Sequence, residues 1–168
     1  MPDMIIQVNE KDEVVGLAPR ESFYGGKIIH RSSHLMLFNS KGEVVTMKRS
    51  MNKRWYPGLY TFSVSGTVDN ETTEKCIKRE MVEEIGIGVP FKKLFTFRHF
   101  DDSDNAFATL YSAVSDKNIT PDRQEISEVN WVTLDWLKKD MANHPTKYTH
   151  TMLEGMKIYW GKYGIELP

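Results

Sequence analysis

Three glutamates within one short segment have a spacing that could bind a metal ion. Glu80, Glu83 and Glu84 lie one to four residues apart, so on a helix their carboxylates share an arc of about 100°. Like charges at this spacing destabilise a helix by about 0.2–0.5 kcal/mol per pair, and a bound cation would offset that repulsion. A site of carboxylate oxygens suits Mg²⁺ or Mn²⁺ better than Zn²⁺ or copper. The alternative is a solvated acidic face, with Arg79 and Lys75 as counter-charges.

The segment that carries these glutamates, residues 71–87, has the features of one helix. Asp69 and Asn70 offer side chains that can cap its first turn, and Gly86 is the residue type expected just past its last turn. Apolar residues recur along one face, which predicts packing against a core. That face consists of Ile77, Met81, Val82 and Ile85.

The residues around the glutamates match a longer pattern. Residues 79–87 read R-E-M-V-E-E-I-G-I, and Glu71 stands eight positions before Arg79. This resembles the Nudix signature, G-x₅-E-x₇-R-E-U-x-E-E-x-G-U, where U is an aliphatic residue. Ser65 stands where the glycine is expected and Gly66 follows it, so the loop is one residue shorter. In the family, a backbone carbonyl near this glycine also binds metal, which here implies Ser65 or Gly66.

The resemblance implies both a fold and a reaction. The fold would be an α/β/α sandwich, with a mixed sheet and the signature helix packed on it, in one domain of residues 1–168. The reaction would be Mg²⁺- or Mn²⁺-dependent hydrolysis of a diphosphate bond in a nucleoside-diphosphate-linked or related compound. Glu80 and Glu84 would bind the metal, Glu83 would bind a second ion or orient water, and Arg79 would hold one of the glutamates.

Other segments are similar to one branch of the family, the isopentenyl-diphosphate isomerase-like proteins. These segments are residues 8–16, 29–34, 48–50, 56–58 and 125–131. The isomerase needs a catalytic cysteine and a metal-binding histidine where this chain has Ser65 and Thr67. It also needs a glutamate pair in a later strand, and residues 107–113 contain none. A serine hydroxyl is far less acidic than a thiol, so we expect hydrolysis rather than isomerisation.

A third function stays open, because the shortened loop would also suit a catalytically weak domain that binds a nucleotide. His30 lies near a metal-binding histidine of the isomerases, but a lone histidine is more often a surface or core residue. Cys76 lies in the signature helix without a cationic partner, and we expect it to be structural.

Cationic residues after an apolar strand are candidates to bind phosphate. They are Lys48, Arg49 and Lys53. Ammonium and guanidinium groups are suited to binding phosphate. Arg49 follows the strand directly and is the strongest candidate, whereas Lys53 could instead lie in a solvated loop. Trp55 and Tyr56 could stack on a base or pack beneath the loop.

The signature does not identify the general base that assists the attacking water. Glu125, Glu128 and the acidic turn at residues 101–104 are candidates, and each could instead be a plain surface carboxylate.

Bulk properties narrow the class of protein. A chain of 168 residues suits one compact domain, and its net charge of −1 argues against general nucleic-acid binding. One cysteine fits a reducing compartment, and no run approaches the roughly 20 apolar residues of a membrane span. We therefore expect a cytoplasmic enzyme with a small-molecule diphosphate partner, without nucleic acid or membrane. The aromatic C-terminal segment leaves a homodimer open.

The remaining pattern predicts a sheet covered by helices on both sides. Strands are expected at residues 4–8, 14–17, 35–38, 43–49, 59–68, 91–100, 106–114 and 129–132. Two further helices are expected at residues 134–141 and 148–163.

Overall fold

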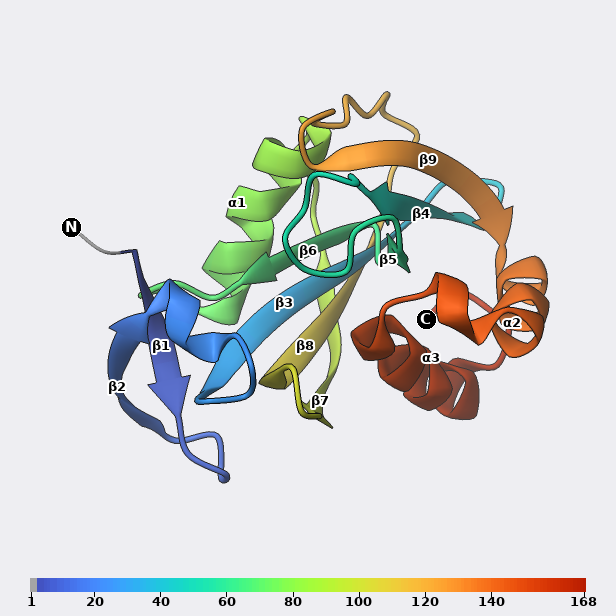
Figure 1. Cartoon of the computed structure of the whole chain (residues 1–168). Coiled ribbons are helices and arrows are strands. Elements are labelled where there is room, and N and C mark those ends of the chain that lie inside the picture. Colours follow the sequence, from blue (N-terminus) through green and yellow to red (C-terminus); the bar gives the residue numbers. More distant parts are fainter. Residues whose placement is uncertain (1–2) are drawn as a thin grey trace.

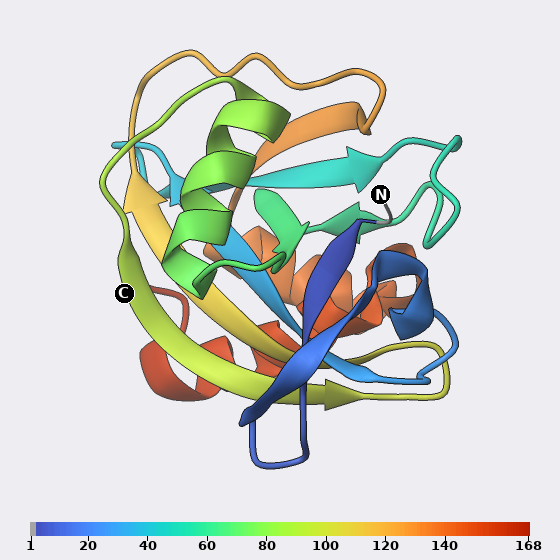
Figure 2. The same ribbon diagram turned by 90° about the vertical axis from the view of Figure 1, so that its left-hand side faces the viewer.

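The computed structural model describes residues 3–168 and places one mixed sheet between two helical layers (Figure 1). Helix α1 (Thr73–Ile85) covers one face of the sheet. Helices α2 (Leu134–Asn143) and α3 (His150–Tyr163) cover the other. Figure 2 looks onto α1, with α2 and α3 behind the sheet. The expected α/β/α sandwich with the signature helix packed on the sheet is confirmed.

Nine strands form the sheet, and β3 lies at its centre. β3 pairs with β8 in parallel and with β1, β4 and β6 in antiparallel, while β4 pairs with β5 and β9. The strands are β1 (Met4–Val8), β2 (Val14–Pro19), β3 (Ile29–Phe38), β4 (Glu43–Arg49), β5 (Tyr60–Thr61), β6 (Val64–Thr67), β7 (Lys92–Phe100), β8 (Asn105–Val114) and β9 (Ile126–Thr133). Two short 3₁₀ helices, η1 (Arg20–Phe23) and η2 (Pro145–Lys147), precede β3 and α3.

The alternation of side chains along β3 divides the core into two layers. Leu35 and Leu37 pack with the apolar face of α1, whereas Met36 and Phe38 pack with α2 and α3. All four are fully buried or nearly so, as expected for a strand covered on both faces. This packing fixes α1 against β3 and β6, and so fixes where the signature glutamates project.

The ends of α1 differ in detail from the expectation. Thr72 caps the helix by accepting a hydrogen bond from the Lys75 amide at 3.2 Å, while Asp69 pairs with Arg20 instead. Gly86 ends the helix with a φ of 71°, a left-handed conformation that favours glycine. Val82 lies at the edge of the apolar face and is 58% exposed, so it is not a core residue.

Two strands also differ from the expectation. β3 begins at Ile29, six residues before the expected start at residue 35. The sequence pattern missed this part of the strand because residues 30–34 are polar and show no alternation of apolar and polar side chains. The expected strand at 59–68 is interrupted between Thr61 and Val64, which gives β5 and β6. Both differences bring polar residues toward the site described below.

The aromatic residues of the C-terminal helix belong to the same core. Tyr159 is fully buried, and Trp160 and Tyr163 pack against its cluster. Within the described chain, no helix is long and apolar enough to cross a membrane.

Candidate active site

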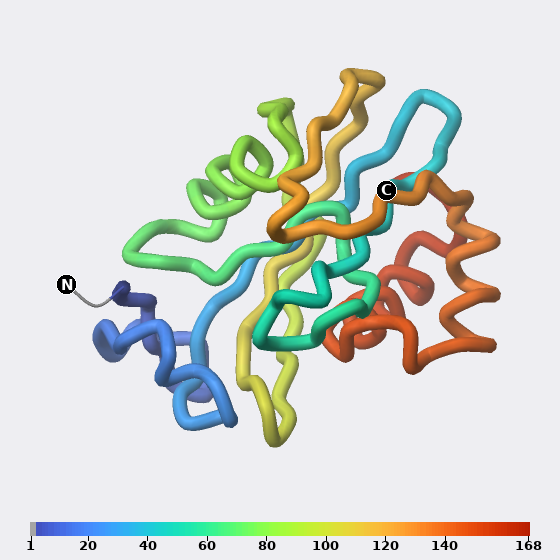
Figure 3. The backbone as a smooth tube through the Cα atoms, turned by 45° about the horizontal axis from the view of Figure 1, so that its top comes forward, coloured from blue at the N-terminus to red at the C-terminus, as the bar shows by residue number. Residues whose placement is uncertain are grey.

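A pocket of about 740 Å³ opens where α1 meets β3 and β6. Loops from four parts of the chain add to its wall: η1 with its following turn, the β4–β5 loop, the β7–β8 turn, and the loop before β9. The start of α3 contributes Thr149 and Thr151. Figure 3 shows the β4–β5 loop, in teal, beside the yellow β7–β8 turn. The Tyr56 hydroxyl joins these two loops at 3.0 Å from the Ser103 hydroxyl. The Gly25 amide donates to the Ser103 carbonyl at 3.0 Å, which attaches the segment after η1.

All three signature glutamates line this pocket, at different depths. The Glu84 carboxylate accepts a hydrogen bond from the Ser65 amide at 3.1 Å. Burial, followed by the negative charge of Glu80, raises the pKa of Glu84 to about 8. Burial also raises the pKa of Glu80. Glu83 is 56% exposed in its side chain and therefore lies at the rim.

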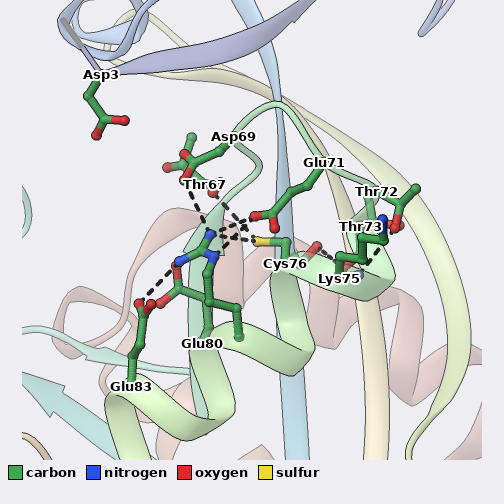
Figure 4. Close-up of polar contacts among 12 residues, drawn as sticks. Asp3, Thr67, Asp69, Glu71, Thr72, Thr73, Lys75, Cys76, Glu80 and Glu83 are labelled. Carbon is green, nitrogen blue, oxygen red and sulfur yellow. Dashed lines mark hydrogen bonds and ion pairs between the residues drawn. The ribbon is translucent and has the colours of Figure 1, made fainter. Parts of the chain in front are cut away.

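Arg79 holds two of the glutamates through one guanidinium group. Its Nη1 atom lies 2.8 Å from Glu80 Oε1 and 3.1 Å from Glu83 Oε2. Its Nη2 atom lies 2.6 Å from Glu71 Oε1 and 3.5 Å from Asp69 Oδ2. Figure 4 shows Glu71, Glu80 and Glu83 converging on this group. The pKa of Arg79 is raised, mainly by the hydrogen bond to Glu71, so the guanidinium stays charged.

Gly66 is the position at which β6 passes closest to the helix. A Cβ atom at Gly66 would lie 2.4 Å from Glu80 Cγ and 2.6 Å from its Cδ. Only glycine leaves Glu80 in its observed position, despite the loop being one residue shorter than the signature. The thiol of Cys76 is buried nearby, and burial raises its pKa to about 12.

Two histidines of β3 form the polar wall opposite α1. His30 Nε2 lies 2.7 Å from Asp104 Oδ1. His34 lies between two hydroxyls, at 2.9 Å from both Ser32 Oγ and Ser65 Oγ. Burial lowers the pKa of His34 to about 3, so its imidazole is neutral. Ser65, which stands at the isomerase cysteine position, thus contacts a neutral histidine through its hydroxyl and the Glu84 carboxylate through its backbone amide.

The structure separates the three expected phosphate-binding residues. Arg49 is partly buried and lines the pocket. Lys53 also lines it, and its ammonium pairs with Glu125. Lys48 is absent from the described pocket wall, and its ammonium lies 3.6 Å from Glu128. Arg49 and Lys53 therefore line the same pocket as the signature glutamates, whereas Lys48 does not.

Another part of the wall carries aromatic rings, and the sequence pattern missed some of them. Trp55 stacks on Tyr24 with ring centroids 4.5 Å apart and planes 19° apart. The Arg54 guanidinium lies over both rings, at 5.3 Å and 5.5 Å from their centroids. Phe23 and Arg20 complete this part of the wall. Residues 20–24 carry no motif, so only the folded chain brings them to the site.

Comparison with known proteins agrees with this geometry. The NUDIX domain model matches residues 29–152. A prenyl-diphosphate phosphatase from Methanosarcina mazei is 40% identical, over 97% of this chain and 98% of that protein. An isopentenyl-diphosphate Delta-isomerase from Enterobacter sp. (strain 638) is 30% identical, over 89% of this chain and 86% of that protein. The crystal structure of DR0079 from Deinococcus radiodurans superposes with a TM-score of 0.72 at 27% identity, covering 84% of this chain and 90% of that one. The chain belongs to the Nudix family of hydrolases.

Proposed function

We propose that this Nudix hydrolase cleaves the diphosphate of a prenyl-type substrate, an apolar chain carrying two linked phosphates. The supporting observation is that one pocket is lined both by the signature glutamates and by the rings of Phe23, Tyr24 and Trp55. In the reaction, a water oxygen would bond to the terminal phosphorus while the bond from that phosphorus to the bridging oxygen breaks. The products would be inorganic phosphate and the prenyl monophosphate.

Glu80 and Glu84 are the residues we propose to hold a divalent ion, with Glu83 at the rim and the Gly66 carbonyl as further ligands. The donor set is all oxygen, which suits Mg²⁺ or Mn²⁺. The raised pKa of Glu84 fits the proposal, because a buried carboxylate without a cation is unfavourable. When bound, a divalent ion neutralises phosphate charge and lowers the pKa of bound water. In this scheme Arg79 is a positioning residue.

Arg49 and Lys53 would bind the diphosphate from the opposite side of the pocket. A partly buried guanidinium can hold two phosphate oxygens at once. The rings of Phe23, Tyr24 and Trp55 would contact the apolar chain, since each Å² of apolar surface removed from water contributes about 25 cal/mol. The relative named a prenyl-diphosphate phosphatase supports this substrate class over a nucleoside diphosphate.

Glu125 is the candidate we favour for assisting the attacking water. It lines the pocket, and its negative charge contributes to the raised pKa of Glu84, which places it near the proposed metal site. Glu128 is absent from the described pocket wall. Asp104 also lines the pocket. Both carboxylates are paired, Asp104 with His30 and Glu125 with Lys53, but Asp104 is not among the main charges that shift the pKa of Glu84.

The Gly66→Ala substitution tests the position of Glu80. The added methyl group must push the Glu80 side chain away, so we expect metal-dependent activity to fall by about 10–100-fold. Gly16→Ala is the matched control, because an added Cβ there meets no atom within 4 Å. Steady-state rates of both variants over a Mg²⁺ series measure the effect. Equal activity of Gly66→Ala and the unmodified protein would contradict the proposed role of Glu80.

A substrate panel tests the substrate class. The panel contains geranyl and farnesyl diphosphate, isopentenyl diphosphate, and nucleoside-diphosphate sugars, each with and without Mg²⁺. We expect metal-dependent release of inorganic phosphate from the two longer prenyl compounds, with the monophosphate detected by mass spectrometry. Faster turnover of the nucleoside-diphosphate sugars would contradict the proposed substrate class and identify a nucleotide substrate instead. Conversion of isopentenyl diphosphate without phosphate release would identify an isomerase.

We also propose that residues 1–168 act as one domain in the cytoplasm. The NUDIX match covers 29–152, but β1 pairs with β3 and the Tyr159 side chain of α3 completes the core. These contacts of segments outside the match support the proposal of one domain. The free cysteine, Cys76, fits a reducing compartment.

A further inference from the structure

A second group of possible metal ligands lies outside the pocket. His99 is near the end of β7, Asp101 begins the turn after it, and His150 is the first residue of α3. Their ligand atoms all lie within 4.8 Å of one another, and they are the one such group of His, Cys, Asp and Glu side chains within residues 3–168. None of the three lines the pocket. The group therefore differs from the signature glutamates in both place and chemistry.

The distances within the group match those between ligands of one small cation. Asp101 Oδ2 lies 3.4 Å from His99 Nε2 and 3.1 Å from His150 Nδ1. A tetrahedral Zn²⁺ site with bonds of about 2.0–2.1 Å has ligand atoms about 3.3 Å apart. Two of the three separations thus match those of such a site, and the third, between the two imidazoles, is within 4.8 Å.

Hydrogen bonds orient the Asp101 carboxylate, and a further carboxylate lies near His150. The other carboxylate oxygen of Asp101 accepts hydrogen bonds from the Ser103 amide, the Ser103 hydroxyl and the Asp104 amide, at 2.7–2.8 Å. These bonds leave Oδ2 directed at the two histidines. The second ring nitrogen of His150 lies 3.7 Å from Glu154 Oε1. A carboxylate on the far side of a ligating imidazole is the usual support of a metal-binding histidine.

His99 supplies an independent observation. Its side chain is 1% exposed, and neither ring nitrogen has a hydrogen-bond partner in the described chain. Buried polar atoms are nearly always paired, so an unpaired buried imidazole facing a carboxylate requires an explanation.

We infer that His99, Asp101 and His150 form a binding site for a Zn²⁺-type transition-metal ion. The ion would fasten the first turn of α3 to the β7–β8 turn. His150 is half exposed, so a water molecule can complete the coordination. Ser103 and Asp104, in the same turn, line the pocket. The ion would therefore stabilise one wall of the active site without contacting the substrate.

Cobalt spectroscopy on the full-length protein tests this site. Co²⁺ reports tetrahedral nitrogen and oxygen coordination by its visible d–d absorption, and Zn²⁺ should displace it at one equivalent. We expect the band in the unmodified protein and in Glu84→Gln, which keeps the His99 group. We expect its loss in His150→Ala and in Asp101→Asn, because the amide can keep the Oδ1 hydrogen bonds but cannot replace the Oδ2 charge. His144→Ala, which alters an exposed histidine paired with Asp140, is the control.

A thermal shift gives a second readout. Zn²⁺ at about 100 times its dissociation constant should raise the melting temperature by about 5–10 °C, and His150→Ala should remove that shift. An equal cobalt spectrum in His150→Ala and the unmodified protein would overturn the inference. So would loss of the band in Glu84→Gln alone, which would assign the ion to the signature glutamates. Neither result depends on whether a prenyl diphosphate is hydrolysed.

Discussion

Replacing Glu84 by glutamine is expected to lower metal-dependent turnover by about 10³-fold. The amide has no charge to offset that of the ion, and half of its orientations present an NH₂ group to it. The affinity for Mn²⁺, measured by calorimetry, should fall in parallel with the rate. Glu74→Gln is the matched control, because Glu74 is an exposed glutamate in the first turn of the same helix.

The same substitution should not destabilise the metal-free protein. Burial raises the folded-state pKa of Glu84 from 4.5 to about 8, so the folded protein binds a proton more tightly than the unfolded chain does. Its contribution to stability is complete below pH 4.5 and is lost as the pH rises toward 8. Glutamine does not titrate, so the melting temperature of Glu84→Gln at pH 8 should equal or exceed that of the unmodified protein. Turnover at the unmodified rate would contradict the proposed role of Glu84.

Replacing Arg79 by alanine is expected to weaken Mn²⁺ binding by about 10–100-fold. Glu71, Glu80 and Glu83 would lose their shared cation and would repel one another away from their observed positions. Calorimetric titration of Mn²⁺ measures the effect. Lys78→Ala is the matched control, because Lys78 is an exposed cation on the same helix.

The variant Arg79→Lys separates charge from geometry. Lysine keeps the positive charge but lacks the planar fork that contacts several carboxylates at once, so we expect it to recover only part of the affinity. Full recovery would show that Arg79 acts by its charge alone. Unchanged Mn²⁺ affinity in Arg79→Ala would contradict a positioning role altogether.

The parts of the fold that could be predicted from the sequence are those with a local signal. The apolar face of α1 and the alternation or apolar runs of most strands follow from the period of each element. The first half of β3 lacks that signal, because His30, Ser32 and His34 point polar side chains at the pocket and at one another. Val82 shows the limit of a helical wheel, since the wheel places it on the apolar face but it is 58% exposed in the folded chain.

The residues of the site could likewise be predicted from the sequence only where a local motif marks them. The spacing of the signature predicted the carboxylates of α1, and the structure places all three on one pocket. The three carboxylates have different partners: Arg79 pairs with Glu80 and Glu83, while Glu84 accepts a hydrogen bond from the Ser65 amide. Tyr24 and the His99 group depend on contacts between distant segments, which no short motif records.

The most direct test of the account is the location of Mn²⁺ in crystals grown with a non-hydrolysable prenyl diphosphate analogue. Anomalous scattering should place an ion between the carboxylates of Glu80 and Glu84, in contact with the phosphates, and the prenyl chain should lie along Tyr24 and Trp55. An analogue bound elsewhere, or no ion at these two carboxylates, would contradict the claim that α1 holds the metal against the diphosphate.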